Sequence, residues 1–406
     1  MPDFIFNLPS DDILTDIQDM AIYDTNSIIV SGGPGTGKTV VTLKRFIRTL
    51  NNDSIDAILF TYNRTLMTNI KGFIRQNPDI FDEIEAMNFA SKIKSLYQWY
   101  YNNVHAYLSE ADLDDINRTF ENHAILNHIL VDEAQDFGSP IISNLHQIGQ
   151  KITCGTDRAQ NLQGRWARNA DEEIIQILRR NRTIVKHTLD QNFRNTKQIF
   201  EFAKLFVPDD PSVNIINTSN MENGNKPRIK TGESESNQLD LIWDIVQENL
   251  NANIGILVHF KKQVKIIRNY FRDKELIDDS DNDMFSYYYN RMPHPDLERF
   301  ENKLLTPFIT TFDSCKGLEF DIVILPLFEI SDWAMRTTRN RQDENGDWTI
   351  VEYNADDTEK KWATRNHYYV ACTRAKRDLY LFCREEPEVL PSFDSNTYLK
   401  NGVRYN

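Results

Sequence analysis

The segment SGGPGTGKT at residues 31–39 constrains the fold of this chain more than any other feature. It has the spacing G-x-x-x-x-G-K-T, follows the apolar residues 28–30, and precedes the helix-like run 40–50. This strand–loop–helix order is typical of a loop that cradles a polyphosphate, because glycines let backbone N–H groups turn toward the phosphates. The start of the helix adds its dipole to the same anion site. The alternative, a glycine-rich turn with a chance lysine, is disfavoured by the flanking strand and helix.

Two side chains of this loop carry the chemistry expected of an ATP site. Lys38 is expected to reach the β- and γ-phosphates, and Thr39 is expected to place its hydroxyl group on Mg²⁺. ATP and Mg²⁺ are therefore the expected cofactors. The predicted nucleotide-binding residues of the loop are Gly32, Gly33, Pro34, Gly35, Thr36, Gly37, Lys38 and Thr39.

A second nucleotide signature, VDEAQD at 131–136, lies at the end of the apolar run that begins at residue 129. An acidic residue at the end of an apolar strand is where a P-loop ATPase holds its metal, so Asp132 is expected to bind Mg²⁺, mostly through water. Glu133 is expected to orient and deprotonate the attacking water. The pair D-E after a strand is a weak pattern alone, but with the glycine-rich loop it makes ATP hydrolysis the leading prediction.

The length and the hydropathy pattern predict more than one α/β domain. A chain of 406 residues is too long for one ordinary core. Strand-like apolar runs alternate with helical periodicity, which favours parallel sheets flanked by helices. The expected strands are 28–31, 57–61, 128–131, 151–155, 184–189, 254–259, 308–311 and 321–326. The expected helices are 40–50, 64–76, 140–149, 171–180, 196–206, 238–250 and 261–272.

The charge of the chain limits its partners. The net charge of −14 argues against a free-standing, high-affinity nucleic-acid binder. Basic residues still gather in 151–204, with eleven Lys/Arg against six Asp/Glu, and in 361–377, with five Lys/Arg and no acid. These two segments could hold a phosphate backbone locally, although solvated helix faces explain them as well.

The cysteines and the hydropathy favour a cytoplasmic protein without a membrane partner. No apolar run approaches the roughly 18–20 residues that span a bilayer. The N-terminus lacks the basic-then-apolar pattern of a secretory signal. Without C-x-x-C spacing, the cysteines are expected to be reduced core residues and not a metal site. They are Cys154, Cys315, Cys372 and Cys383.

The spelling and order of the motifs resemble superfamily 1 helicases of the UvrD/Rep type. GGPGTGKT followed by DEAQD is the first point of similarity, and further motifs appear in the order of that family. The segment at 59–67 resembles the motif that touches single-stranded DNA. The matching segments are LTDIQDMAI at 14–22, LFTYNRTLM at 59–67, AMNFASKI at 86–93, GTDRAQNLQG at 155–164, LDQNFRNTKQIF at 189–200, TTFDSCKGLEFDIVIL at 310–325 and YVACTRAKRDLYL at 369–381.

The resemblance implies an α/β architecture of two tandem RecA-like P-loop domains, with parallel sheets flanked by helices and ATP in the cleft between the domains. The first domain would span residues 1–186 and the second 187–385, and residues 386–406 would form a C-terminal tail. Because each domain would supply part of the ATP site, catalysis would need closure of the cleft.

The resemblance also assigns roles around the nucleotide. Gln18 would contact adenine, Gln160 would sense the γ-phosphate, and Glu319 would contact the ribose. Arg194 and Arg374, from the second domain, would stabilise the charge that develops on the γ-phosphoryl group.

Nucleic-acid contacts are implied at Tyr62, Asn63, Phe89, Trp166 and Lys316. The three aromatic side chains could stack on bases, since stacking tolerates any sequence. Packing inside or between the domains is an equally good interpretation of each.

Two features depart from the family. The positions of its duplex-gripping accessory subdomains, about 92–127 and 270–308, leave little room here, and the histidine of its T-x-H segment is Asp313. A carboxylate beside the nucleic-acid track would repel phosphate unless it is hydrogen-bonded or protonated. ATPase chemistry is therefore expected, whereas unaided strand separation is not.

The leading prediction is an ATP-dependent single-stranded DNA translocase or helicase, with 3′→5′ polarity by resemblance and RNA as an alternative strand. A protein partner such as a nuclease or a DNA-binding subunit is expected, in a DNA repair or anti-phage defence complex. The rival prediction is a nucleotide-driven switch that controls a partner without translocation. A small-molecule kinase would not explain Gln160, the KGLEFD segment or the arginine of the TRA segment.

Overall fold

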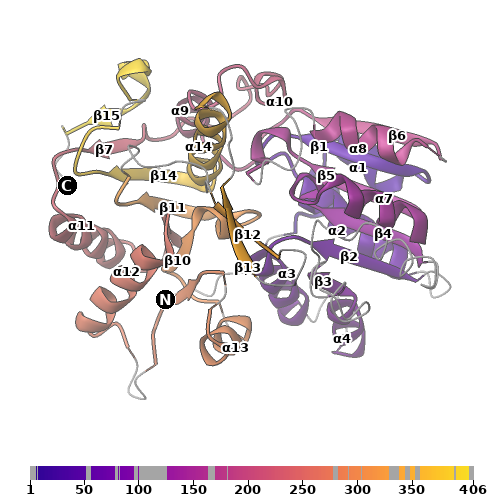
Figure 1. Cartoon of the computed structure of the whole chain (residues 1–406), viewed down its shortest axis with the longest axis horizontal. Helices are drawn as coiled ribbons and strands as arrows, with labels where there is room; N and C mark the ends of the chain where they lie inside the picture. Colours follow the sequence, from indigo (N-terminus) through magenta and orange to yellow (C-terminus); the bar gives the residue numbers. More distant parts are fainter. Residues whose placement is uncertain are drawn as a thin grey trace.

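The computed structural model shows two lobes side by side, each built on a β-sheet (Figure 1). A small two-stranded hairpin forms a third, separate sheet. The structure describes residues 6, 8–51, 56–77, 81, 83–95, 99, 126–162, 170–180, 182–277, 282–290, 292–302, 304–328, 338–342, 348–352, 357–387 and 390–401.

The first lobe contains a six-stranded sheet in the order β3-β2-β4-β5-β1-β6, and all its strand pairs are parallel. Its strands are β1 (Ser27–Gly32), β2 (Ala57–Thr61), β3 (Ile93–Ser95), β4 (Leu126–Asp132), β5 (Gly149–Thr156) and β6 (Ile184–Leu189). The interior strands β1 and β2 are buried along their whole length, as expected for a parallel sheet covered on both faces.

Helices cover both faces of this sheet because alternate strand residues point to opposite sides. Ile58 and Phe60 join a core cluster with α7 and α8, whereas Ala57 and Leu59 join a second cluster with α2, α3 and α4. The helices of the lobe are α1 (Asp16–Tyr23), α2 (Lys38–Leu50), α3 (Arg64–Gln76), α4 (Glu83–Ser91), α7 (Ser139–Ile148) and α8 (Ala170–Leu178).

The second lobe contains a seven-stranded parallel sheet in the order β15-β7-β14-β11-β8-β10-β9. Its strands are β7 (Arg228–Lys230), β8 (Ile254–Val258), β9 (Ser286–Tyr288), β10 (Phe308–Thr311), β11 (Phe320–Leu325), β14 (Ala375–Phe382) and β15 (Leu399–Lys400). Its helices are α9 (Lys197–Lys204), α10 (Pro211–Asn214), α11 (Glu235–Glu248), α12 (Lys261–Asp273), α13 (His294–Asn302) and α14 (Asp357–Cys372).

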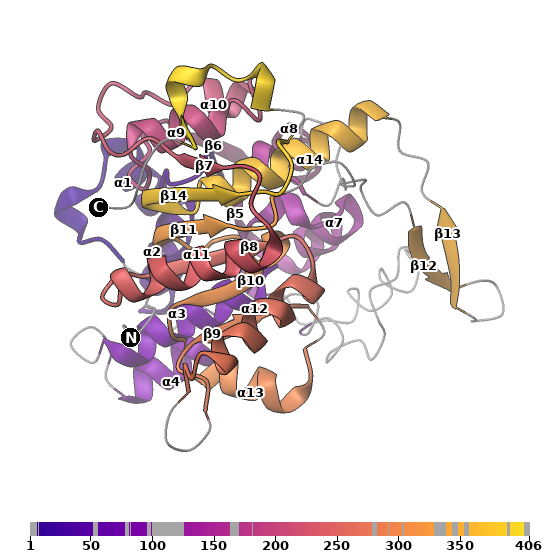
Figure 2. The ribbon, with the colours of Figure 1, turned by 90° about the vertical axis from the view of Figure 1, so that its left-hand side faces the viewer.

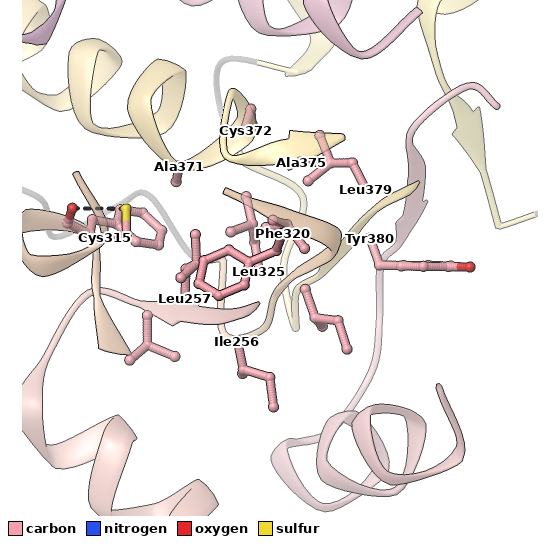
Figure 3. Packing of buried hydrophobic residues seen from close by; sticks show 14 of the residues in the cluster. Ile256, Leu257, Cys315, Phe320, Leu325, Ala371, Cys372, Ala375, Leu379 and Tyr380 are labelled. Carbon is pink, nitrogen blue, oxygen red and sulfur yellow. Dashed lines mark hydrogen bonds between the residues drawn. The ribbon is translucent and has the colours of Figure 1, made fainter. Parts of the chain in front are cut away.

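One large apolar core fills the second lobe. Ile256 and Leu257 of β8 pack with Phe320 and Leu325 of β11, and Ala371 adds the contribution of α14 (Figure 3). Helices α11 and α12 lie on one side of the sheet, and α9 and α14 lie on the other (Figure 1).

A two-stranded antiparallel sheet, β12 (Thr338–Gln342) and β13 (Trp348–Glu352), stands out from both lobes (Figure 2). Short 3-10 segments complete the described elements. They are η1 (Asp11–Ile13), η2 (Ala134–Asp136), η3 (Arg158–Gln160), η4 (Phe312–Cys315), η5 (Leu390–Ser392) and η6 (Ser395–Thr397). Over the described ranges, no helix has both the length and the apolar character that crossing a membrane requires.

The observed sheets confirm the predicted α/β class and each of the predicted strands, within a residue or two at their ends. They differ from the predicted domain limits at two places. β6 pairs with β1 as far as Leu189, so the first sheet ends there and the division at 186/187 falls inside a strand. β15 pairs with β7, so part of the predicted tail belongs to the second sheet. The prediction missed β3, β7, β9 and β15, which have only two or three residues each, and β14, in which three charged residues follow the first alanine.

Candidate nucleotide site between the lobes

The glycine-rich loop joins β1 to α2 and packs against residues 192–194, which follow β6. Gly35 and Gly37 have φ values of +70° and +90°, in the left-handed region that favours glycine. A Cβ atom on Gly35 would lie 2.5 Å from Asn192 Oδ1, so a larger residue would push the two segments apart. The loop is closed by Thr36, whose hydroxyl group donates to the Gly33 carbonyl oxygen at 2.9 Å.

Lys38 lies across this loop. Its Nζ atom donates to the carbonyl oxygens of Gly32 at 2.8 Å and Gly33 at 2.6 Å, and it pairs with Asp157 Oδ2 at 3.1 Å. The ammonium group is therefore held at the loop where the polyphosphate is expected, by acceptors that an incoming phosphate could replace.

Thr39 and Asp132 meet at the start of α2 and the end of β4. Thr39 Oγ1 donates to Asp132 Oδ2 at 2.8 Å. Burial and the neighbouring charge of Glu133 raise the pKa of Asp132 to about 7. A hydroxyl and a carboxylate fit Mg²⁺, which takes oxygen ligands and completes its shell with phosphates and water. Among the described residues, no cluster of three or more His, Cys, Asp or Glu side chains could hold a metal ion.

Glu133 follows Asp132 in a left-handed conformation with φ of +56° and is only 5% exposed. Its Oε2 atom accepts a hydrogen bond from Gln135 Nε2. Burial raises the pKa of Glu133, but the charges of Lys316, Lys38 and Arg374 outweigh burial and hold it below its ordinary value. The carboxylate is therefore ionised, as a proton acceptor must be.

Gln160 connects the two lobes at this site. Its Nε2 atom donates to Asp157 Oδ2 at 2.5 Å, and its Oε1 atom accepts from Arg374 Nη2 at 3.1 Å. Since Asp157 also binds Lys38, a continuous chain of contacts runs from the glycine-rich loop to the second lobe.

Arg374 lies between α14 and β14 and is fully buried. Its Nε atom donates to the Val370 carbonyl oxygen at 3.0 Å, and its Nη1 atom donates to that of Leu318 at 3.4 Å. Burial lowers its pKa to about 10, so the guanidinium stays charged at neutral pH. The second lobe thus presents a fixed positive charge to the site.

Arg194 and Glu319 form an ion pair beside the loop. Arg194 Nε lies 3.0 Å from Glu319 Oε2, and Lys376 Nζ lies 3.5 Å from Glu319 Oε1. Burial raises the pKa of Glu319, but Arg194 and Lys376 outweigh it and lower the pKa. The backbone N–H of Phe193 donates to the Gly35 carbonyl oxygen at 2.9 Å, so this segment is fixed to the loop.

Gln18 supports the loop from α1. Its Oε1 atom accepts from the Thr15 backbone N–H, and its Nε2 atom donates to the Thr36 carbonyl oxygen, both at 3.0 Å. Both ends of the side chain amide are therefore engaged, and its contact with adenine stays a prediction.

The structure does not bear out three of the predicted nucleic-acid contacts. Asn63 is buried, and its Nδ2 atom donates to the Ser314 carbonyl oxygen at 2.8 Å. Lys316 is 1% exposed and bound inside the contact between the lobes. Phe89 is 4% exposed and meets the Phe46 ring edge-on at 6.1 Å. In each of these three residues, the group that was predicted to contact a nucleic-acid strand instead packs or forms hydrogen bonds inside the protein.

The two other predicted contacts remain predictions. Tyr62 is half-buried, with its ring 5.5 Å edge-on from that of Phe137. Trp166 lies outside the described residues. Asp313, the departure from the family's histidine, lies 3.2 Å from His367 Nε2 of α14, so its carboxylate has the hydrogen-bonding partner that the sequence left open.

Sequence reasoning missed a basic and aromatic surface at the carboxyl end of β8. Phe260 is 55% exposed at the start of α12. Beside it, the Nζ atoms of Lys261 and Lys265 lie 5.9 and 5.7 Å from the centre of the buried Tyr289 ring, which follows β9. The signal was the run FKKQVK at 260–265, directly after the predicted strand 254–259. Asp157 was also missed, although it lies inside the GTDRAQNLQG segment.

The fold and this site define a two-lobed P-loop protein of the helicase class. The sequence model of the Schlafen group 3 DNA/RNA helicase domain matches residues 25–385. The chain therefore belongs to the Schlafen group 3 DNA/RNA helicase domain family. This match does not single out the UvrD/Rep type.

Among the solved structures that resemble the chain, two illustrate the likeness, both at low identity. One is the C-terminal domain of a possible DNA helicase from Lactobacillus plantarum WCFS1, 18% identical over 52% of this chain and 98% of that one, with a TM-score of 0.31. The other is S. cerevisiae Dbp5 bound to RNA and ADP BeF3, 11% identical over 93% of this chain and 85% of that one, with a TM-score of 0.49. No curated protein sequence matches the chain.

Proposed function

We propose that this chain is an ATP-driven motor on single-stranded nucleic acid, which hydrolyses ATP between its two lobes. The contact that carries this proposal is the bond from Arg374 of the second lobe to Gln160 of the first. Through Asp157, Gln160 reaches Lys38 on the glycine-rich loop. Closure of the lobes and the chemistry of the phosphates therefore depend on the same side chains.

The site residues divide the reaction among them. Glu133 takes a proton from the attacking water, while Lys38 and Arg374 stabilise the charge on the transferred phosphoryl group. Mg²⁺, bound at Thr39 and Asp132, would neutralise part of the phosphate charge. Because the arginine comes from the other lobe, hydrolysis is fast only in the closed arrangement.

The order of the motifs, which is that of the UvrD/Rep type, supports single-stranded DNA as the track and 3′→5′ movement, with RNA as the alternative strand. The surface of Phe260, Lys261 and Lys265 offers an exposed ring for stacking and cations for phosphate. Since the net charge is −14, binding should be local, weak and strongly salt-dependent.

Replacing Phe260 by alanine is expected to weaken single-strand binding by about 1–3 kcal/mol, the usual value of one stacked base. Fluorescence anisotropy with a labelled oligothymidine at low salt measures this change. Tyr23→Ala is the matched control, because Tyr23 is an exposed aromatic residue of the first lobe, 49% exposed and covered by Arg48. Equal affinities of Phe260→Ala and wild type would show that this surface does not bind the single strand.

Unwinding by the chain alone is expected to be poor, which favours a working partner such as a nuclease or a DNA-binding subunit in a repair or defence complex. The described residues between 274 and 307 form β9, at the edge of the second sheet, and α13, and no independent duplex-gripping subdomain is seen among them. A strand-displacement assay on a 3′-tailed duplex measures this. Fast, processive unwinding by the purified monomer would contradict it.

The central test is the ATP turnover of the purified chain with and without single-stranded DNA, RNA and duplex. A motor requires that a single strand raise the turnover. If no strand does so even at low salt, the nucleotide-driven switch becomes the better explanation of the same site.

A further inference from the structure

Lys316 crosses from the second lobe into the first. It follows η4, and its Nζ atom donates to Asp136 Oδ1 at 2.6 Å and to the Gln160 carbonyl oxygen at 2.5 Å. Asp136 and Gln160 are the last residues of η2 and η3, two short turns of the first lobe. One ammonium group therefore ties the second lobe to the turn after Glu133 and to the turn that carries the Gln160 side chain.

This ion pair depends on closure of the lobes. Both charged side chains are at most 2% exposed, and a buried charge that loses its partner is strongly destabilising. If the lobes part, Lys316 and Asp136 separate and both return to water. The pair thus belongs to the closed arrangement and distinguishes it from an open one.

The segment that carries Lys316 is held by the first lobe at a second place. Ser314 accepts hydrogen bonds on its carbonyl oxygen from Asn63 Nδ2 at 2.8 Å and from Thr65 Oγ1 at 2.6 Å. Gly317 then turns the chain with φ of +74°, and a Cβ atom there would lie 2.7 Å from Leu66 Cδ2. Residues 314–317 of the second lobe therefore connect the start of α3 to the ATP site.

We propose that Lys316 is a positioning residue, whose contacts with Asp136 and Gln160 order the hydrolytic site only when the lobes close. Glu133 gains from the same closure, because Lys316 is foremost among the cations that lower its pKa. The inference rests on the proposed function where ATP turnover is the readout, whereas the geometry of the closed lobes can be measured without it.

Dye labels on the two lobes test the closure directly. Met87→Cys in α4 and Asn269→Cys in α12 place labels on exposed positions, and the native cysteines are all buried. Lys316→Gln and Asp136→Asn are expected to lengthen the inter-dye distance measured by energy transfer, and the double variant should change it no further. Lys316→Arg, which keeps a charged donor, should restore the shorter distance. Lys400→Gln, far from the interface in an exposed pair with Glu386, is the control.

ATP turnover supplies the second readout. Lys316→Gln should lower kcat by about tenfold or more, within the range of coupling between sites, while the KM for ATP changes far less. Circular dichroism establishes that each variant is folded. A wild-type dye distance together with wild-type kcat in Lys316→Gln would overturn the inference. If the wild-type chain proves inactive toward ATP, the proposed function fails, and the dye distance alone decides the role of Lys316.

Discussion

Replacing Glu133 by glutamine is expected to reduce ATP turnover by about 10²–10⁴-fold, the usual contribution of a general base. The amide has nearly the same shape and can still accept the hydrogen bond from Gln135, so the fold should persist. It cannot take a proton from water. Steady-state turnover measures the loss, and binding of a fluorescent ATP analogue should show that the nucleotide is still held.

Glu235→Gln is the matched control for this variant, because Glu235 is exposed in the first turn of α11 and lies outside the nucleotide site. It should leave turnover and the melting temperature unchanged. Near wild-type hydrolysis by Glu133→Gln would show that another group activates the water.

Replacing Arg374 by lysine is expected to lower kcat by about 10³–10⁵-fold, the range found for an arginine that stabilises phosphoryl transfer. Lysine keeps the positive charge, but it cannot reproduce the fork that joins Val370, Leu318 and Gln160. The KM for ATP should change far less, because the interaction grows in the transition state. Turnover measured across ATP concentrations separates the two parameters.

The alanine variant of Arg374 is less informative, because the side chain is fully buried. Its loss leaves acceptors unpaired at about 1–3 kcal/mol each, so stability would fall together with activity. Arg377→Ala is the control, since Arg377 lies nearby in β14 with its side chain 53% exposed. Arg194→Ala, at a less buried position, should also reduce kcat more than ATP affinity. A loss confined to affinity would assign either arginine to ground-state binding.

The sequence alone determined the local parts of the nucleotide site. The loop from Gly32 to Thr39 is contiguous, and its glycine spacing and flanking periodicity dictate the strand, the turn and the helix start. The position of Asp132 and Glu133 at a strand end follows from the same periodicity. In the structure, the parallel pairing of β5 with both β1 and β4 brings these segments together.

Only the tertiary structure decided what the isolated side chains face. Lys316 lies 180 positions from Asp136, and Asn63 lies 251 from Ser314, so no local pattern reports that they meet. The exposed face of an aromatic residue is likewise set by its neighbours in space, which buried Phe89 and left Phe260 in solvent. Local patterns fix backbone shape through short-range sterics and periodic burial, whereas the partner of a charge or a ring depends on how two lobes close.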